Sequence, residues 1–169
     1  DFERVIFNVV RVTGAPLSFK NPIVHVEVNG WRCQIRMPIV SGGRWEVECT
    51  KLSPPPPLNN YDGPILAARL LTLSLTRIAT LISGEPGAGK TTLLGSICNG
   101  VWKFYPHLRT VVVERIPEIY VPPHLRGVVS RLVARRDDDL GGMIQYAIRF
   151  SRPDVLIVGE IRAHDVDFV

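Results

Sequence analysis

Apolar and polar positions alternate along two short stretches near the start of the chain. Residues 23–28 read Ile-Val-His-Val-Glu-Val, and residues 31–37 return with the same period of two. Asn29-Gly30 lies between them, a pair that tolerates the positive φ angles of a two-residue hairpin turn. A second, weaker hairpin is indicated by Ser41-Gly42-Gly43 and the alternating residues 45–49. The first fifty residues therefore predict β structure.

Prolines interrupt this pattern after residue 53. Four in succession, residues 54–57, favour a stiff extended connection, and the turn-rich residues 59–64 cannot continue a helix or a central strand. We expect a domain boundary here, and a long surface loop within one domain is the alternative. The division places a β-rich N-terminal domain in residues 1–52, a proline-rich linker in residues 53–64 and a second domain in residues 65–169.

After the linker, the pattern predicts helices and strands in alternation. Helices are expected over residues 65–77, 90–98 and 139–150. Strands are expected over residues 78–83, 108–114, 118–121 and 154–158. Asp139 is a good N-cap for the last helix, and one face of that helix gathers the apolar residues Leu140, Ile144, Ala147 and Ile148. This alternation indicates an α/β fold with a mainly parallel sheet and helices on both faces.

Composition and charge narrow the class of protein. The chain has 169 residues, 46% of them hydrophobic, as expected of a globular protein with a core. No apolar run reaches the roughly 18–20 residues that cross a bilayer, and no secretory signal is visible. The net charge of +4 comes from scattered basic residues rather than from a stripe, which argues against nucleic acid as a partner.

The cysteines and the two ends of the chain give weaker indications. Cys33, Cys49 and Cys98 are widely spaced and odd in number, so they fit neither a disulfide framework nor a zinc site. We therefore expect a reducing, cytosolic compartment. The chain opens on Asp1 and stops at Val169 inside a predicted helix, so we expect it to be a piece of a longer protein.

A glycine-rich loop carries the clearest chemistry. Residues 84–91 read Gly-Glu-Pro-Gly-Ala-Gly-Lys-Thr, which fits the phosphate-loop pattern, between a predicted apolar strand and a predicted apolar helix. Glycines let backbone N–H groups surround a phosphate, and the positive end of the helix points at the anion. Lys90 is expected to reach the β- and γ-phosphate oxygens, and the Thr91 hydroxyl to bind Mg²⁺. A chance glycine-rich turn before a helix is the alternative.

Two carboxylates follow predicted strands of the same sheet. Glu160 ends the apolar residues 155–158 after one glycine, and Glu114 ends the run of valines at 111–113. Because parallel strands present their C-terminal ends at one edge, both side chains are expected to converge near the γ-phosphate. One would help to hold Mg²⁺ and the other would polarise the attacking water. An exposed strand end for Glu160, and an ion pair with Arg109 or Arg115 for Glu114, are the alternatives.

These motifs resemble those of the secretion-superfamily ATPases, the hexameric motors of type II and type IV secretion, conjugation, and bacterial and archaeal pilus assembly. The resemblance covers residues 84–92, 113–119 and 140–162. Its most specific part ends in Pro-Asp-Val-Leu-Ile-Val-Gly-Glu-Ile-Arg, with Gly159 where most phosphate-loop ATPases carry Asp. It implies a RecA-like ATPase core with an α/β fold, truncated at its C-terminus, preceded by part of a small α+β, PAS-like N-terminal domain.

The resemblance also assigns roles to individual residues. Nucleotide binding falls to Gly84, Glu85, Pro86, Gly87, Ala88, Gly89, Lys90, Thr91 and Thr92. Glu114 lies in a segment similar to the family's Asp box, whose glutamate activates water, while Thr91 and Glu160 would organise Mg²⁺. Residues 29–36 are similar to the N-terminal hairpin whose arginines reach the phosphates, so Arg32 and Arg36 are further catalytic candidates; a solvated strand arginine is the alternative.

The sequence departs from the family's pattern at a few points. Arg115 stands where the family usually has an acidic residue, a later strand arginine is replaced near Glu48, and the chain contains no His box after Glu160. The resemblance implies an ATP- and Mg²⁺-dependent homo-hexamer that acts on a membrane-embedded secretion or pilus platform and is cytoplasmic, peripheral to the cytoplasmic membrane. Two alternatives remain open: a nucleotide-binding assembly or switch protein with little turnover, and a DNA-conjugation or packaging ATPase.

Overall fold

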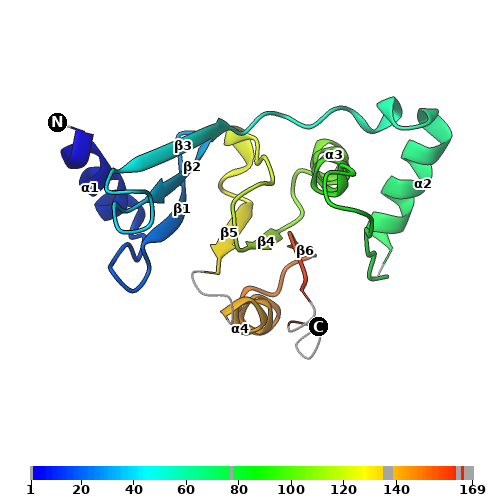
Figure 1. Cartoon of the computed structure of the whole chain (residues 1–169). Coiled ribbons are helices and arrows are strands. Elements are labelled where there is room, and N and C mark those ends of the chain that lie inside the picture. Colours follow the sequence, from blue (N-terminus) through cyan, green and yellow to red (C-terminus); the bar gives the residue numbers. More distant parts are fainter. Residues whose placement is uncertain (1, 77, 135–138, 163–164, 166–169) are drawn as a thin grey trace.

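In the part of the chain that the structure describes, the strands form two separate three-stranded sheets (Figure 1). The computed structural model describes residues 2–76, 78–134, 139–162 and 165. The strand order is β1-β2-β3 in the first sheet and β5-β4-β6 in the second. The helix expected at Val169 lies outside the described residues. Within them, no helix combines the length and the apolar character that crossing a bilayer requires.

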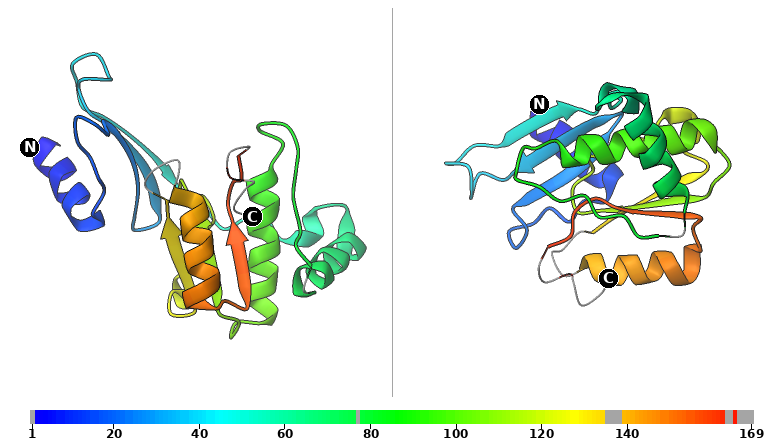
Figure 2. Two further views of the ribbon diagram at one scale, coloured as in Figure 1. Left: turned by 90° about the horizontal axis from the view of Figure 1, so that it is seen from below. Right: turned by 90° about the vertical axis from the view of Figure 1, so that its right-hand side faces the viewer.

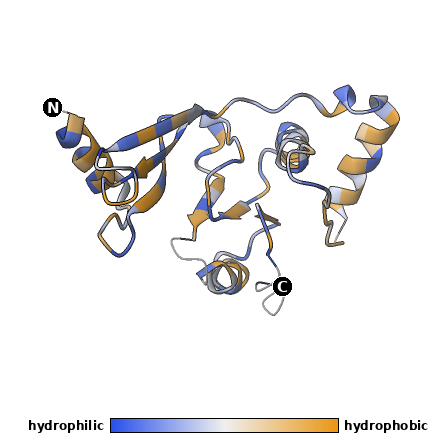
Figure 3. Ribbon diagram, in the orientation of Figure 1, coloured by the Kyte–Doolittle hydropathy of each residue, from blue (hydrophilic) through white to orange (hydrophobic). Residues whose placement is uncertain are grey.

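The first sheet is antiparallel, as its alternating sequence predicts. β1 (Ile23–Val28) and β2 (Trp31–Arg36) pair around Asn29 and Gly30, whose φ angles of 50° and 79° are those of the predicted hairpin turn. β3 (Glu46–Lys51) then pairs with β2. The colours of Figure 3 show the alternation of hydrophobic and hydrophilic residues along this sheet.

A helix precedes this sheet, so the prediction of β structure throughout the first fifty residues is wrong. α1 (Phe2–Thr13) buries Ile6 against β1 and β2 and packs Val9 and Val10 around the same cluster. Val9 and Val10 lie three and four positions after Ile6, a spacing that places all three on one face of a helix. The helical face was therefore present in the sequence beside the stronger hairpin pattern.

The cysteines correct a second expectation. The register of β2 and β3 places Cys33 directly opposite Cys49, and the two form a disulfide. The pairing depends on the alignment of two strands, which cysteine spacing alone does not reveal. Cys98 is a free thiol, buried on α3.

An extended connection leads from the first sheet to the helices of the second half. Residues 52–57 form neither helix nor strand (Figure 1), and the short 3₁₀ helix η1 (Leu58–Asn60) follows. α2 (Gly63–Leu75) confirms the predicted helix and packs against α3 (Lys90–Phe104). The helices approach closely at Gly100, where a Cβ atom would lie 2.7 Å from Leu71 Cδ2.

The second sheet is parallel, as predicted. β4 (Thr110–Glu114) lies at its centre, between β5 (Val129–Val133) and β6 (Val155–Val158). β4 is completely buried because helices cover both faces of the sheet. On one face, Cys98 and Trp102 of α3 pack on Val112.

The other face of this sheet carries α4 (Asp139–Tyr146), whose buried residues pack on Val111 and Val113. The helix continues as the π-helical turn η3 (Ala147–Ser151). The wider turn changes the phase of the helix, so Ala147 is buried whereas Ile148, predicted on the same face, is 56% exposed.

Two predicted strands are absent from this part of the chain, and one strand was missed. Residues 78–83 form no strand beside β6; Ile82 instead packs on the cluster formed by α2 and α3. Residues 118–121 are also irregular, because the N–H groups of Glu118 and Ile119 bind the Glu114 carboxylate instead of a neighbouring strand. β5 was missed, since a polar Arg131 interrupts its short apolar pattern.

Cys98 is expected to resist alkylation while the protein is folded. Burial raises the pKa of its thiol from 9.0 to about 12, with the charge of Glu114 contributing in the same direction. Only the thiolate reacts, so labelling at pH 8 requires unfolding. The same shift lowers the free energy of unfolding as the pH rises from about 9 towards 12. Mass spectrometry after iodoacetamide treatment, with and without denaturant, measures this, and rapid labelling of the native protein would contradict it.

Candidate nucleotide site

The glycine-rich loop leads directly into α3. Gly87 and Gly89 have φ angles of 79° and 85°, a left-handed conformation that residues with a Cβ rarely adopt. A Cβ atom at either position would meet nothing within 4 Å, so the glycines are needed for the backbone conformation, and open space lies beside them. The first turn of α3 then directs unpaired backbone N–H groups and the positive end of its dipole at the loop. This arrangement suits a phosphate group.

Lys90 is the first residue of α3 and folds back over the loop. Its Nζ donates hydrogen bonds to the backbone carbonyls of Gly84 and Glu85, at 2.9 and 2.8 Å. The loop therefore holds the ammonium group at its open side, where it can exchange a carbonyl for a phosphate oxygen.

The residues predicted to hold Mg²⁺ are of suitable chemical type. Thr91 supplies a hydroxyl in the first turn of α3, and Glu160 supplies a carboxylate that is largely exposed after β6. Mg²⁺ prefers such hard oxygen ligands and retains several water molecules, so a hydroxyl, a carboxylate and phosphate oxygens form a fitting set. Thr91 and Glu160 thus fit the ion that the sequence implies.

The loop and the strand ends lie at one end of the second sheet (Figure 2). α3 runs opposite to the strands that it covers, so its N-terminus lies where β4 and β6 finish. Glu114 ends β4, and Glu160 follows β6 with Gly159 between them. The predicted placement of both carboxylates at the end of neighbouring parallel strands is therefore observed.

Glu114 is the most enclosed of these side chains, at 1% exposure. Its Oε1 accepts hydrogen bonds from the backbone N–H groups of Glu118 and Ile119, both at 2.9 Å. Its Oε2 lies 3.2 Å from Arg131 Nε, but neither atom makes an aligned hydrogen bond within the described part of the chain. The carboxylate is therefore fixed through one oxygen and retains the other as an acceptor.

The environment of Glu114 favours proton uptake. Burial raises the pKa of this carboxyl above its ordinary value, and the charge of Glu118 acts in the same direction more weakly. The Arg131 guanidinium and the two backbone N–H groups oppose the rise. A carboxylate whose pKa is raised is a stronger base, a property that general-base catalysis uses.

Gly159 is required by the packing of Glu114. A Cβ atom at Gly159 would lie 2.9 Å from Glu114 Cγ, closer than real contacts allow. The backbone of Gly159 is itself held by a hydrogen bond from its N–H to the Val113 carbonyl, at 2.9 Å. The glycine that the sequence shows before Glu160 therefore leaves room for Glu114.

Glu160 differs from Glu114 in its surroundings. Its side chain is 58% exposed, and its Oε1 lies 3.4 Å from Arg162 Nε. The predicted pair of carboxylates thus consists of one buried group with fixed hydrogen bonds and one accessible group. The two can serve different tasks, as general base and as metal ligand respectively.

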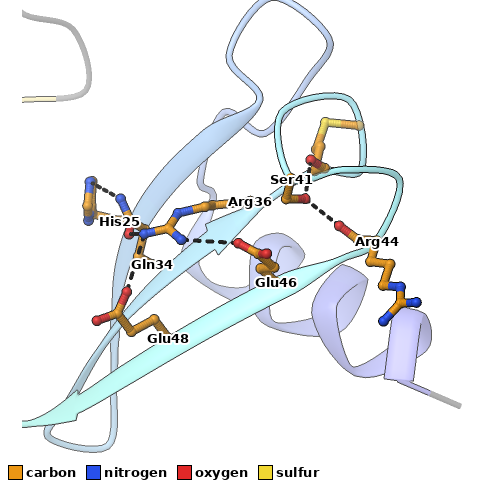
Figure 4. Close-up of polar contacts among 8 residues, drawn as sticks. His25, Gln34, Arg36, Ser41, Arg44, Glu46 and Glu48 are labelled. Atoms are coloured by element: carbon orange, nitrogen blue, oxygen red, sulfur yellow. Dashed lines mark hydrogen bonds and ion pairs between the residues drawn. The ribbon is translucent and has the colours of Figure 1, made fainter.

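The two predicted arginines lie on β2 of the first sheet, and both are engaged in ion pairs. Arg32 pairs with Glu118, in the segment that also holds the Glu114 carboxylate. Arg36 pairs with Glu46 at 3.1 Å and Glu48 at 3.3 Å, as Figure 4 shows. The structure therefore brings Arg32 to the residues after β4, whereas Arg36 is held within its own sheet.

Sequence reasoning missed two buried arginine pairs near Glu114. Arg115, which departs from the family's pattern, forms an ion pair with Asp165 at 2.5 Å, and both side chains are at most 5% exposed. Arg131 contacts Glu114 from β5. A charged residue after the valines of β4, and one inside an apolar strand, were the available signals, because such residues are rarely buried without a partner.

A cavity of about 930 Å³ lies between the first sheet and the residues that follow β4. Its charged and titratable lining consists of His25, Glu27, Arg115, Arg131 and Arg162. Burial lowers the pKa of His25, helped by the charges of Arg32 and Arg36. The cavity thus places a basic wall next to the segment that holds Glu114.

Two solved structures have a similar fold. The chain superimposes on the Legionella pneumophila ATPase DotB with a TM-score of 0.70 at 20% identity, covering 96% of this chain and 48% of that one. The pilus retraction motor PilT, solved with bound ADP, gives a TM-score of 0.68 at 20% identity and covers 98% and 48%. The chain therefore has an α/β fold with a parallel sheet, as the sequence predicts, and shares this fold with both solved structures.

Sequence comparison defines the family. Residues 64–168 match the family described as type II/IV secretion system protein, and the chain belongs to this family. A Mycobacterium tuberculosis protein named for conjugal transfer is 37% identical over 110 residues, which are 61% of this chain and 29% of that protein. The chain thus spans less than a third of this relative and about half of each solved chain.

Proposed function

We propose that the chain hydrolyses ATP as part of a motor that powers a type II or type IV secretion system or the assembly of a pilus. The observation that carries the proposal is the buried Glu114 carboxylate, fixed by two backbone N–H groups at the same end of the sheet as the glycine-rich loop. DotB is described as an ATPase and PilT as a retraction motor with bound ADP, which supports the proposal.

Binding falls to residues 84–92. The N–H groups at the start of α3 and the Lys90 ammonium hold the phosphates, and the positive φ angles of Gly87 and Gly89 keep these donors on one side of the loop. Bound Mg²⁺ neutralises charge that develops on the phosphate oxygens. Thr91 and Glu160 would hold the ion, directly or through water.

Glu114 acts as the general base in this proposal. Its Oε2, buried beside Arg131 in the present arrangement, would accept a hydrogen bond from a water molecule once the site opens to it. It would take a proton as that water attacks the γ-phosphorus, while the bond from this phosphorus to the β-phosphate oxygen breaks and ADP leaves. Oε1 stays bound to the N–H groups of Glu118 and Ile119, so the carboxylate does not need to reorient. The preorganised position lowers the barrier because little reorganisation remains for the reaction itself.

Arg32 and Arg36 are proposed to stabilise the phosphates only after the first sheet moves. In the present arrangement both are engaged in ion pairs, Arg32 with Glu118 and Arg36 with Glu46 and Glu48. In each of these ion pairs at least one side chain is more than a third exposed, so the pair is weak. The arginine can therefore leave its glutamate for a phosphate. Such an exchange would couple hydrolysis to movement of the N-terminal part, with the prolines 54–57 as connection.

The wider assembly also belongs to the proposal. We expect a hexamer of this chain in its full-length form, acting on a membrane-embedded secretion or pilus platform from the cytoplasmic side. The family description, type II/IV secretion system protein, supports the link to a secretion system.

We expect ATP hydrolysis to depend on Mg²⁺ and on the Thr91 hydroxyl. In the full-length protein, phosphate release should depend on Mg²⁺, and Thr91→Ala should lower kcat about tenfold by removing one oxygen ligand. A phosphate-release assay across Mg²⁺ concentrations measures this, with Thr72→Ala, on the exposed side of α2, as the matched control. Tight ATP binding without turnover would overturn the motor and favour an assembly or switch protein.

A conjugation ATPase is the second candidate, favoured by the Mycobacterium tuberculosis relative that is named for conjugal transfer. It predicts hydrolysis that is stimulated by DNA and falls steeply with salt. The same phosphate-release assay with added single- and double-stranded DNA separates it from the first candidate.

A further inference from the structure

Arg131 lies in the middle of β5, on the same face of the sheet as Glu114. In the parallel register it stands opposite Val112, and Glu114 follows Val112 by two positions along β4. Neighbours in register, and residues two apart on one strand, share a face. The register alone therefore brings the Arg131 side chain beside the Glu114 carboxylate.

The Arg131 guanidinium meets acceptors from three separate parts of the chain. Nη1 donates to Glu27 of β1, and Nη2 donates to the backbone carbonyl of Ile119. Nε faces Glu114 Oε2 at 3.2 Å. The side chain is only 15% exposed, so these contacts are largely shielded from water. A planar guanidinium can span three such acceptors, whereas a single ammonium cannot.

These contacts hold Glu114 from two directions. The N–H of Ile119 binds Glu114 Oε1, and the carbonyl of the same residue binds Arg131. Arg131 therefore closes a ring that contains the carboxylate and the loop that supports it. Removing the guanidinium would remove the ion pair with the second oxygen of Glu114 and the hydrogen bond to the Ile119 carbonyl.

The contact with Glu27 extends this ring to the first sheet. Glu27 belongs to β1, more than a hundred residues away in the sequence. The ion pair between Arg32 and Glu118 makes a second connection between the first sheet and the same loop. Arg131 is therefore the side chain that contacts both Glu114 and the first sheet, while Arg32 reaches Glu114 only through Glu118.

We propose that Arg131 is a positioning residue that orients the Glu114 carboxylate and, through Glu27, makes this orientation depend on the seating of the first sheet. The proposal rests on the function proposed for Glu114. It assigns a role to a residue that contacts neither the glycine-rich loop nor Glu160 in the described structure.

The charges around Glu114 determine the direction in which each substitution should shift the pKa of this carboxyl. Among the residues that the structure describes, three titratable or charged groups face the carboxylate: Arg131 from β5, Glu118 from the following loop and Cys98 from α3. Cys98 is neutral at ordinary pH because burial raises its pKa to about 12. Burial raises the pKa of Glu114, and Arg131 is the charged group that opposes this rise. Glu27 in turn partly neutralises Arg131.

Arg131→Gln and Glu27→Gln are expected to move the pH profile in opposite directions. In the full-length protein, Arg131→Gln should lower kcat about tenfold and shift the acidic limb of the kcat profile upward by about one pH unit, with KM for ATP within about twofold. Glu27→Gln should shift the same limb downward by a smaller amount, because Arg131 then acts on Glu114 alone. A residue that only stabilises the fold would not produce opposite shifts.

Two further variants complete the experiment. Arg131→Lys keeps the positive charge but not the three contacts. The acidic limb of its kcat profile should therefore lie where it does in the parent protein, while kcat stays low. Arg126→Gln removes an exposed arginine from the same segment and should leave both quantities unchanged. If Arg131→Gln fails to fold, Glu27→Gln still tests the proposal, because Glu27 is partly exposed and its substitution is expected to leave the fold intact.

The result that overturns the proposal is a parent-like kcat and pH limb in Arg131→Gln, or an unshifted limb in Glu27→Gln. Glu114→Gln, measured in parallel, separates this failure from failure of the proposed function. An inactive Glu114→Gln beside a parent-like Arg131→Gln would reject only the role of Arg131. A fully active Glu114→Gln would reject the proposed base itself.

Discussion

Glu114→Gln is expected to lower kcat for ATP hydrolysis by about 10²–10⁴-fold while nucleotide affinity changes by less than about threefold. Glutamine has the size of glutamate, and its amide oxygen can still accept the hydrogen bonds from the N–H groups of Glu118 and Ile119. The amide nitrogen, however, cannot take a proton from water. Single-turnover phosphate release and fluorescent-nucleotide binding measure the two effects separately.

Glu3→Gln is the matched control for this prediction. It makes the same chemical change on the exposed side of α1, where Glu3 accepts a hydrogen bond from Trp45 Nε1 at 3.0 Å. Its turnover should stay within about twofold of the parent, as is usual for exposed substitutions. Parent-like turnover by Glu114→Gln itself would show that another group activates the water.

Gly159→Asp should disrupt both the packing and the chemistry of the same carboxylate. Its Cβ would lie 2.9 Å from Glu114 Cγ, and β4 cannot retreat because Val113 and Glu114 are almost completely buried. The new carboxylate would also add negative charge beside a buried one. We expect a loss of at least about 2 kcal/mol in the free energy of unfolding and a fall in kcat of more than about 100-fold.

Thermal melting and phosphate release test this prediction, with Gly142→Ala as the control. Gly142 is exposed within α4, and a Cβ atom there would meet nothing within 4 Å. Alanine at that position should raise stability by about 0.5–1 kcal/mol and leave turnover unchanged. An unaltered melting temperature and kcat in Gly159→Asp would mean that Glu114 is not packed against Gly159.

Much of the parallel core could be predicted from the sequence because its signals are local. The valines before Glu114 and the apolar run before Gly159 define β4 and β6, and the glycine-rich loop defines the start of α3. Each pattern lies within a dozen residues, so no knowledge of distant parts is needed.

What could not be predicted depends on partners that are distant in the sequence. The apolar residues 78–83 predict a buried strand, but Ile78 and Leu81 are exposed, and Ile82 packs on the cluster formed by α2 and α3. The Cys33–Cys49 disulfide follows from strand register. The contact between Arg131 and Glu27 joins residues more than a hundred positions apart.

Candidate site residues divide along the same line. The loop and the two glutamates were predicted from short motifs, and the structure places them at one end of the sheet. The surroundings of these residues could not be derived from short motifs. Glu114 forms its ion pair with Arg131 and not with Arg109 or Arg115, which lie nearer to it in the sequence. Neighbours in space set the protonation and the orientation of a buried carboxylate, and these neighbours come from separate strands.

The two hydrogen bonds to Glu114 Oε1 have a mechanical consequence. An ionised carboxylate accepts backbone N–H bonds more strongly than a neutral one, so each proton gained by Glu114 weakens its hold on Glu118 and Ile119. Glu118 is also the partner of Arg32 on the first sheet. Protonation of the Glu114 carboxylate therefore weakens the contact between the loop at Glu118 and the first sheet, and deprotonation strengthens this contact again.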